Sequence, residues 1–167
     1  METLPRICLT GPESTGKTDL AGRLAKHFGT TFVPEFSRGY AEARSNELTY
    51  ADVEPIVRGV MALPPAPILD TDLISTVVYS RHYYGDCPPW IVAEARARRA
   101  DLYLLMDTGV EWRPDPARDR GGEEREELFD SFRRALDEFE TRWAIISGGW
   151  DERFQKALAE IALFSRL

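Results

Sequence analysis

Residues 11–18 read GPESTGKT and match the pattern GxxxxGK[ST], in which Gly11, Gly16, Lys17 and Thr18 hold the fixed places. An apolar run at residues 5–10 precedes this loop, and residues 17–28 follow it with apolar side chains at helical spacing. Glycine permits the turn that points backbone N–H groups at phosphate oxygens, and the start of a helix attracts the anion. The sequence therefore predicts a strand, a phosphate-binding loop and a helix, in that order.

Each part of this loop has a chemical role. Lys17 is expected to reach the β and γ phosphates of a nucleoside triphosphate, and Thr18 to supply a hydroxyl group to Mg²⁺. A chance match in a glycine-rich turn would not lie between a strand and a helix, so we favour the phosphate site. The predicted nucleotide-binding residues of the loop are Gly11, Glu13, Ser14, Thr15, Gly16, Lys17 and Thr18.

Short apolar runs alternate with helical patterns along the whole chain. Strands are expected at residues 5–10, 31–33, 66–69, 102–106 and 144–147. Helices are expected at residues 17–28, 36–44, 49–63, 71–84, 88–99, 123–143 and 152–163, with Thr49 capping the third. This alternation predicts an α/β protein, a P-loop NTP hydrolase or kinase fold with a parallel five-stranded sheet and helices on both faces. We expect one domain over residues 1–167, with a lid loop at about 110–122.

Acidic residues follow two of the expected strands. Glu35 comes after the second strand, and Asp70 and Asp72 come after the third. Ligands of parallel sheets bind beyond the carboxyl ends of the strands, and phosphoryl transfer needs an acid for Mg²⁺ and a base for the acceptor hydroxyl. We expect Thr18, Asp70 and Asp72 on the metal side and Glu35 nearer the acceptor. The alternative for each acid is a helix N-cap, which is weighed equally with a water-mediated metal contact for Asp70.

The stretch between the fourth expected strand and residue 125 is rich in arginine. Arg113, Arg118, Arg120 and Arg125 alternate there with acidic residues and prolines. A long loop in a compact domain usually has a function, and a lid would carry Arg118 and Arg120 to the transferring phosphoryl group. The alternative is a solvated charged surface loop.

Several aromatic side chains lie near the expected strand ends or the lid. A flat heterocyclic substrate would stack on one or two of them, although most of such residues pack in cores. The residues considered are Tyr40, Tyr83, Tyr84, Trp90 and Trp112.

Composition excludes some classes of protein. The formal net charge of -7 disfavours general nucleic-acid binding. No apolar run is long enough to cross a bilayer and no leader pattern is visible, so we expect a cytoplasmic protein without a membrane partner. The two cysteines have no neighbouring ligand pattern for a metal. Oligomeric state is left open.

Taken together, these motifs resemble the ribosylnicotinamide kinases, the kinase part of NadR-like proteins. Residues 34–38 (PEFSR) are similar to the family's PEYAR element, and residues 70–73 (DTDL) follow the third strand as in the family. Trp112, Asp115 and Arg118 resemble its W-x-x-D-G-x-R lid, and the loop at 147–153 resembles its closing S-G…E-R turn near adenine. Pro116 stands where the family has a lid glycine, and Val60 stands where a glutamine commonly follows Gly59.

The resemblance implies ATP-dependent phosphorylation of the 5′-hydroxyl of nicotinamide riboside to nicotinamide mononucleotide, with Mg²⁺. Glu35 or Asp72 would then deprotonate the hydroxyl group, and Gly148 and Arg153 would lie near adenine. The residues expected to bind the nucleoside are Glu35, Arg38, Tyr40, Asp72, Trp90 and Trp112. The rival interpretations are a kinase for another nucleoside or small metabolite, and a regulatory P-loop ATPase.

Overall fold

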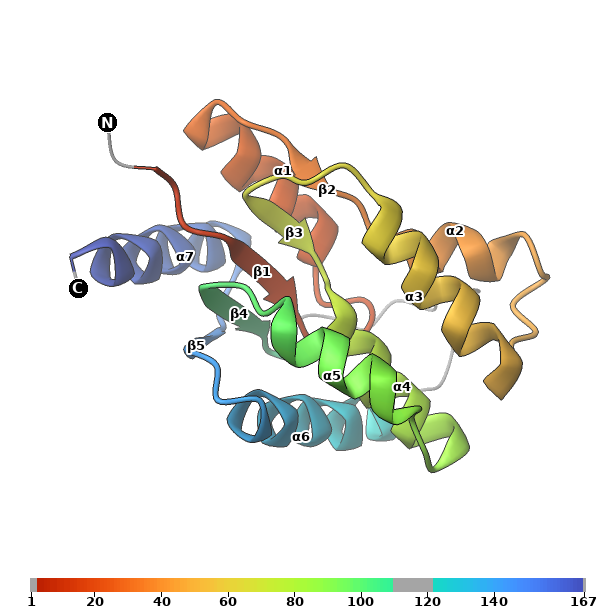
Figure 1. Cartoon of the computed structure of the whole chain (residues 1–167). Helices are drawn as coiled ribbons and strands as arrows, with labels where there is room; N and C mark the ends of the chain where they lie inside the picture. The colour runs from red at the N-terminus through yellow and green to blue at the C-terminus, as the bar shows by residue number, and fades with distance from the viewer. Residues whose placement is uncertain (1–2, 110–121, 167) are drawn as a thin grey trace.

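The computed structural model describes residues 3–109 and 122–166, which form a parallel sheet covered by helices (Figure 1). The strands are β1 (Ile7–Thr10), β2 (Phe32–Val33), β3 (Ile68–Asp70), β4 (Leu102–Met106) and β5 (Trp143–Ile146). Their order is β2-β3-β1-β4-β5, and every neighbouring pair is parallel. The prediction of a five-stranded parallel sheet is confirmed.

Helices cover both faces of the sheet, as predicted. They are α1 (Lys17–Phe28), α2 (Phe36–Glu42), α3 (Val53–Ala62), α4 (Leu73–Tyr84), α5 (Pro89–Ala97), α6 (Gly122–Glu138) and α7 (Trp150–Ser165), with a 3₁₀ turn, η1 (Tyr50–Asp52), before α3. The capping role of Thr49 is confirmed, because it forms a capping box with Asp52 at the start of η1.

Alternate residues of the central strands face opposite sides of the sheet. In β1, Ile7 and Leu9 pack with α1 and α7, whereas Cys8 packs with α3, α4, α5 and α6. In β4, Leu104 lies on the first side and Tyr103 on the second. Strands buried on both faces read as continuous apolar runs, and this is why their positions were visible in the sequence.

The order of the strands determines where a ligand can bind. The chain passes from β1 outward to β2, returns through β3 beside β1, and then continues to β4 on the other side of β1. Such a change of direction opens a crevice at the carboxyl ends of the strands. Residues 11–16 follow β1 directly at this point.

One helix is shorter than expected. The pattern at residues 123–143 predicts a continuous helix, but α6 ends at Glu138, and Trp143 begins β5. The backbone of Glu140 has a positive φ of 55°, and the Thr141 N–H donates to Leu136 O. This left-handed turn ends the helix and redirects the chain into the sheet.

The predicted lid at about 110–122 lies almost entirely outside the described residues, and the one-domain organisation stays a prediction. Of the helices in the two described ranges, none has both the length and the apolar character needed to cross a bilayer.

Candidate active site

The phosphate loop turns sharply between β1 and α1. Gly11 has a φ of 127° and Gly16 a φ of 84°, both in the region that side chains disfavour. Neighbouring atoms also leave no room for a side chain. A Cβ on Gly11 would lie 3.0 Å from the carbonyl oxygen of Met106, and one on Gly16 would lie 2.2 Å from the Trp150 ring. The backbone conformation disfavours a side chain at both positions. The Met106 backbone adds a close contact at Gly11, whereas the contact at Gly16 is with the end of the half-exposed Trp150 side chain.

Polar contacts fix the shape of this loop. The buried Lys17 Nζ donates to Gly11 O at 3.0 Å and to Pro12 O at 2.6 Å, and the Thr15 hydroxyl donates to Pro12 O at 2.8 Å. Arg125 of α6 donates through Nη2 to Ser14 O at 3.3 Å. The lysine thus lies inside the loop, where the phosphates of a nucleotide would be bound.

A hydrogen bond joins Thr18 in the first turn of α1 to Asp70 at the end of β3. The Thr18 hydroxyl donates to Asp70 Oδ2 at 2.6 Å. Asp70 is 2% exposed, and its other oxygen, Oδ1, has no hydrogen-bond partner among the described residues. Burial raises the pKa of Asp70, although the charges of Lys17 and Arg38 and the Thr18 bond oppose the rise.

This pair fits Mg²⁺, which is commonly bound by one or two carboxylates, substrate phosphates and water rather than by a protein cage. An unsatisfied buried carboxylate oxygen beside a hydroxyl group supplies such a contact. In the described part of the chain, no cluster of three or more His, Cys, Asp or Glu side chains could hold a metal by itself. A metal here would therefore need the phosphates of a nucleotide as further ligands.

Asp72 points elsewhere. It caps α4, with Oδ1 accepting from the Ile74 N–H at 3.0 Å, and its Oδ2 accepts from the Tyr103 hydroxyl at 2.5 Å. Burial raises the pKa of Asp72 to about 6, against the effect of these hydrogen bonds. Of the two aspartates, Asp70 contacts Thr18 and Asp72 is the helix cap. The geometry thus departs from the expectation that Asp72 is the acid nearest the metal.

A cavity of about 330 Å³ lies between α2, α3 and α4, and Asp72 borders it. Its walls include the side chains of Asp52, Tyr79 and Tyr83, together with aliphatic residues from α3. None of its described lining residues carries a positive charge. Asp72 also lines a second cavity of about 410 Å³ on the other side of Val60. The first cavity has the size and composition of a small-molecule site.

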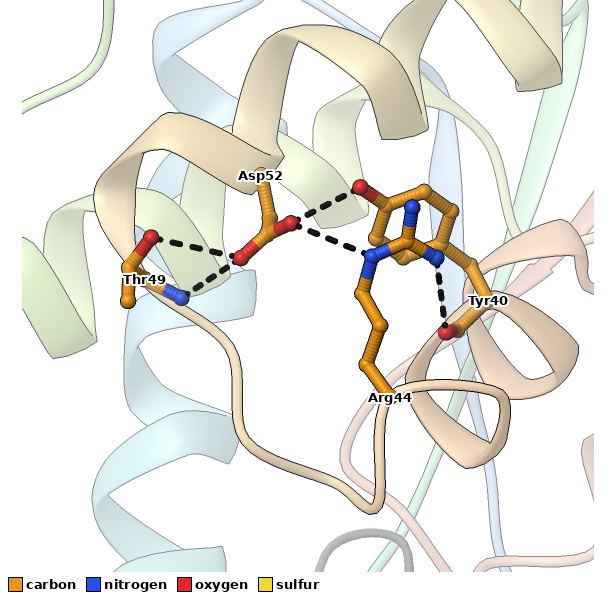
Figure 2. A network of polar contacts seen from close by, with 4 residues as sticks. All are labelled: Tyr40, Arg44, Thr49 and Asp52. Carbon is orange, nitrogen blue, oxygen red and sulfur yellow. Dashed lines mark hydrogen bonds and ion pairs between the residues drawn. The ribbon is translucent and has the colours of Figure 1, made fainter.

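Figure 2 shows a polar network of four residues, two of which, Thr49 and Asp52, line the first cavity. The Tyr40 hydroxyl donates to Asp52 Oδ1 at 2.7 Å, and Arg44 Nε lies 3.5 Å from the same oxygen. The Thr49 N–H donates to Asp52 Oδ2 at 2.8 Å. The backbone bond from Thr49 and the hydrogen bond from Tyr40 lower the pKa of Asp52, so the carboxylate stays charged at neutral pH.

The network engages both the hydroxyl group and the ring of Tyr40. The Arg44 guanidinium lies 3.5 Å from the centre of the Tyr40 ring, and Tyr40 does not line the cavity. Trp90, at the start of α5, lines neither of the two cavities beside Asp72 and lies near Arg58 instead. The aromatic residues that do line the cavity are Tyr79, Tyr83 and Tyr84.

Two other predicted residues have partners in the structure. Glu35, at the N-cap of α2, accepts a hydrogen bond from the Ser37 hydroxyl at 3.1 Å and lines neither cavity. The buried Glu13 side chain accepts from the Tyr79 hydroxyl at 3.1 Å. Glu13 thus ties the phosphate loop to the wall of the cavity, and its other carboxylate oxygen, Oε1, has no hydrogen-bond partner among the described residues.

The closing loop after β5 is also near the phosphate loop. Arg153 donates through Nε to Gly148 O at 2.8 Å and through Nη2 to Asp107 O at 3.2 Å. Trp150, which the sequence analysis did not consider, lies against Gly16. Trp150 could have been found from the sequence, because ligands bind beyond the carboxyl ends of parallel strands and Trp150 follows the end of β5 by four residues.

Three predicted site residues, Trp112, Arg118 and Arg120, fall outside the described residues, and their roles stay predictions. Of the arginines considered for the lid, Arg125 is the one that the structure describes, and it contacts the phosphate loop.

Comparison with known proteins gives consistent matches. A family model described as "AAA domain" matches residues 6–153. The "Trifunctional NAD biosynthesis/regulator protein NadR" of Escherichia coli (strain K12) is 26% identical over 166 residues, covering 91% of this chain and 40% of that protein. The chain therefore spans less than half the length of this relative.

Two solved structures of NadR proteins have the same fold. One, in complex with NAD and AMP-PNP, has a TM-score of 0.72 and 26% identity over 96% of this chain and 49% of that chain. The other, in complex with NR, has a TM-score of 0.71 and 24% identity over 96% of this chain and 51% of that chain. These matches confirm the resemblance to NadR-like proteins and the predicted P-loop fold.

Proposed function

The chain belongs to the AAA domain family, and we propose that it is an ATP-dependent kinase of the cytoplasm. Its proposed reaction is phosphorylation of the 5′-hydroxyl of nicotinamide riboside to give nicotinamide mononucleotide. One observation carries the proposal: residues 70–72 join the phosphate loop to a cavity of nucleoside size. Asp70 contacts Thr18 of the loop, and Asp72, two residues later, borders the cavity. A donor phosphate and an acceptor hydroxyl would therefore meet at this segment.

The loop supplies the donor side. Its backbone N–H groups and Lys17 would bind the β and γ phosphates, and Lys17 would stabilise the charge that develops on the leaving group. Thr18 and Asp70 would hold Mg²⁺, which when bound neutralises charge on the same phosphates. The orphaned Oδ1 of Asp70 supports this role.

The cavity supplies the acceptor side. Its described lining contains the carboxylates of Asp52 and Asp72 and no positively charged side chain. An acceptor that already carries a phosphate would be disfavoured there, because the described lining residues offer two carboxylates and no cation to compensate its charge. A neutral or cationic nucleoside fits better, and the pyridinium ring of nicotinamide riboside is cationic. The likeness to NadR proteins, one of them known in complex with NR, supports this choice.

Proton removal from the acceptor falls to Asp72 or Glu35. Asp72 borders the cavity, and its pKa of about 6 is suited to a base that works near neutral pH. Glu35 is the second candidate. It lies three residues before Arg38, and Arg38 is near enough to Asp70 for its charge to lower the pKa of that carboxyl group. The variants Asp72→Asn and Glu35→Gln distinguish the two acids. Replacing the base should abolish the fall of kcat/KM at low pH, whereas replacing the other acid should leave this fall in place.

Steady-state kinetics with a panel of acceptors tests the proposed substrate. With saturating ATP and Mg²⁺, kcat/KM for nicotinamide riboside should exceed that for uridine, cytidine and adenosine. Nicotinamide mononucleotide and thymidine monophosphate serve as phosphorylated controls and should not be accepted. An equal or higher kcat/KM for an ordinary nucleoside would refute the nicotinamide riboside assignment and leave a kinase with another acceptor.

A further inference from the structure

Tyr79 of α4 joins the first cavity to the phosphate loop. Its side chain lines the cavity, and its hydroxyl group donates to Oε2 of Glu13, the third residue of the loop, at 3.1 Å. In the proposed function the acceptor nucleoside occupies this cavity and its 5′-hydroxyl faces the loop. Because the Tyr79 hydroxyl contacts the loop, it lies at the end of the cavity where the sugar of the acceptor, rather than its base, would be bound.

Packing holds the Tyr79 ring in place. The Tyr83 ring stacks on it, with the ring centres 5.8 Å apart and the planes 20° apart, and the buried Phe132 ring meets it edge-on at 5.7 Å. Tyr83 also lines the cavity, whereas Phe132 belongs to the core. A ring that is packed in this way presents its hydroxyl group at a defined position, as the recognition of a single ligand atom requires.

Glu13 determines how the Tyr79 hydroxyl is oriented. The Glu13 side chain is buried, and it accepts the Tyr79 proton on one of its two carboxylate oxygens. Burial and the charge of Glu13 raise the pKa of Tyr79 well above its ordinary value, although a hydrogen bond with the Glu13 backbone opposes the rise. Tyr79 therefore keeps its proton at neutral pH. A carboxylate accepts hydrogen bonds and donates none, so the proton is directed at Glu13 and the Tyr79 oxygen offers a lone pair to a ligand.

A ligand that meets this oxygen must bring a hydrogen-bond donor. The ring hydroxyls of a ribose are such donors, and they lie beside the 5′ carbon that has to reach the phosphate loop. We propose that Tyr79 is a positioning residue for the acceptor: its oxygen accepts a hydrogen bond from the 2′- or 3′-hydroxyl of the ribose, while Glu13 fixes it relative to the loop. The site then selects ribonucleosides over nucleosides that lack this hydroxyl group. This inference rests on the proposed function in taking the first cavity as the acceptor site.

Steady-state kinetics with deoxynucleosides tests this assignment. The acceptors are the ribonucleoside with the highest kcat/KM in the panel described above and its 2′-deoxy and 3′-deoxy analogues. In the wild type, kcat/KM for the ribonucleoside should exceed that for the analogue without the contacting hydroxyl group by about tenfold, since one hydrogen bond is lost. In Tyr79→Phe this ratio should fall to near one, because neither acceptor can then form the bond. Any general effect of Tyr79→Phe on the loop cancels in the ratio.

Tyr50→Phe is the matched control. It removes the hydroxyl group of an exposed tyrosine that contacts Asp86 and does not belong to the described lining of the cavity. This variant should keep the ratios of the wild type.

Ratios that stay the same in Tyr79→Phe for both analogues would overturn the proposal and show that Tyr79 only supports the loop through Glu13. A wild type that does not distinguish the ribonucleoside from either analogue would also overturn it. Failure of the proposed function is a separate result, in which another ribonucleoside is phosphorylated better than nicotinamide riboside, and the same ratios are then measured with that acceptor. A protein that phosphorylates no nucleoside of the panel would overturn both.

Discussion

Replacing Asp72 with asparagine should change how the stability of the protein depends on pH. Asp72 is 9% exposed, and burial raises its pKa from the ordinary value of 3.8 to about 6. The folded state therefore keeps a proton on Asp72 at pH values where the unfolded chain has released it. Because the folded state binds more protons in this range, the contribution of Asp72 to stability is greatest at low pH and is lost as pH rises through about 6.

The size of the effect follows from the two pKa values. The full shift corresponds to about 3 kcal/mol, reached below the unfolded pKa. Between pH 7.5 and pH 5.0 the contribution of Asp72 should rise by about 1.4 kcal/mol. Asparagine does not titrate, so the stability difference between the wild type and Asp72→Asn should change by this amount over the same interval.

Urea denaturation followed by circular dichroism at pH 7.5 and pH 5.0 measures this difference. Asp130→Asn is the matched control, because the Asp130 side chain is 55% exposed on α6 and its stability difference from the wild type should not follow the same trend. If the difference between the wild type and Asp72→Asn is the same at both pH values, burial does not control this carboxyl group and the reasoning is refuted.

Three further predictions concern the phosphate loop. Lys17→Ala should lower kcat by at least about 100-fold with an unchanged circular dichroism spectrum, since it removes charge where charge develops; near-normal turnover would contradict the phosphate site. Asp70→Asn should raise the Mg²⁺ concentration needed for half-maximal activity, because Asp70 contacts Thr18; an unchanged Mg²⁺ titration curve would remove Asp70 from the metal site. Gly16→Ala should weaken tripolyphosphate binding by at least about tenfold, because it combines a strained φ with a clash against Trp150. Calorimetry that shows wild-type affinity for this variant would mean that the loop adapts.

Much of the fold could be predicted from the sequence because the strands are buried on both faces. β4 and its neighbours read as apolar runs, and the phosphate loop has fixed residues whose roles follow from its geometry. The exception was the end of α6. The amphipathic sequence pattern continues to residue 143, but the helix ends at Glu138 and the backbone of Glu140 turns into the left-handed region.

The division of roles among the acids could not be predicted, because it depends on one dihedral angle and on a distant strand. Thr71 has a positive φ of 69°, and the carboxylates on its two sides have different partners. Asp70 contacts Thr18, whereas Asp72 contacts Tyr103 of β4. Spacing along the chain indicates that both acids lie at the sheet end but not which partner each one has.

The aromatic residues show a similar limit. Tyr40 and Trp90 were plausible stacking residues from their positions, but arginines lie near both rings. Whether an aromatic ring is available to a ligand depends on neighbours that are remote in sequence or one helical turn away. Tyr79 became visible as a candidate only once α4 was placed beside the phosphate loop, where its hydroxyl group contacts Glu13.

The fate of the γ-phosphoryl group of ATP tests the central claim most directly. ATP with a radiolabelled γ-phosphate is incubated with the protein and Mg²⁺, with and without nicotinamide riboside, and the products are separated. A kinase should transfer the label to nicotinamide mononucleotide, in equal amount to the ADP formed and only when the nucleoside is present. Release of the label as inorganic phosphate, at the same rate with and without the nucleoside, would contradict the account and indicate a P-loop ATPase.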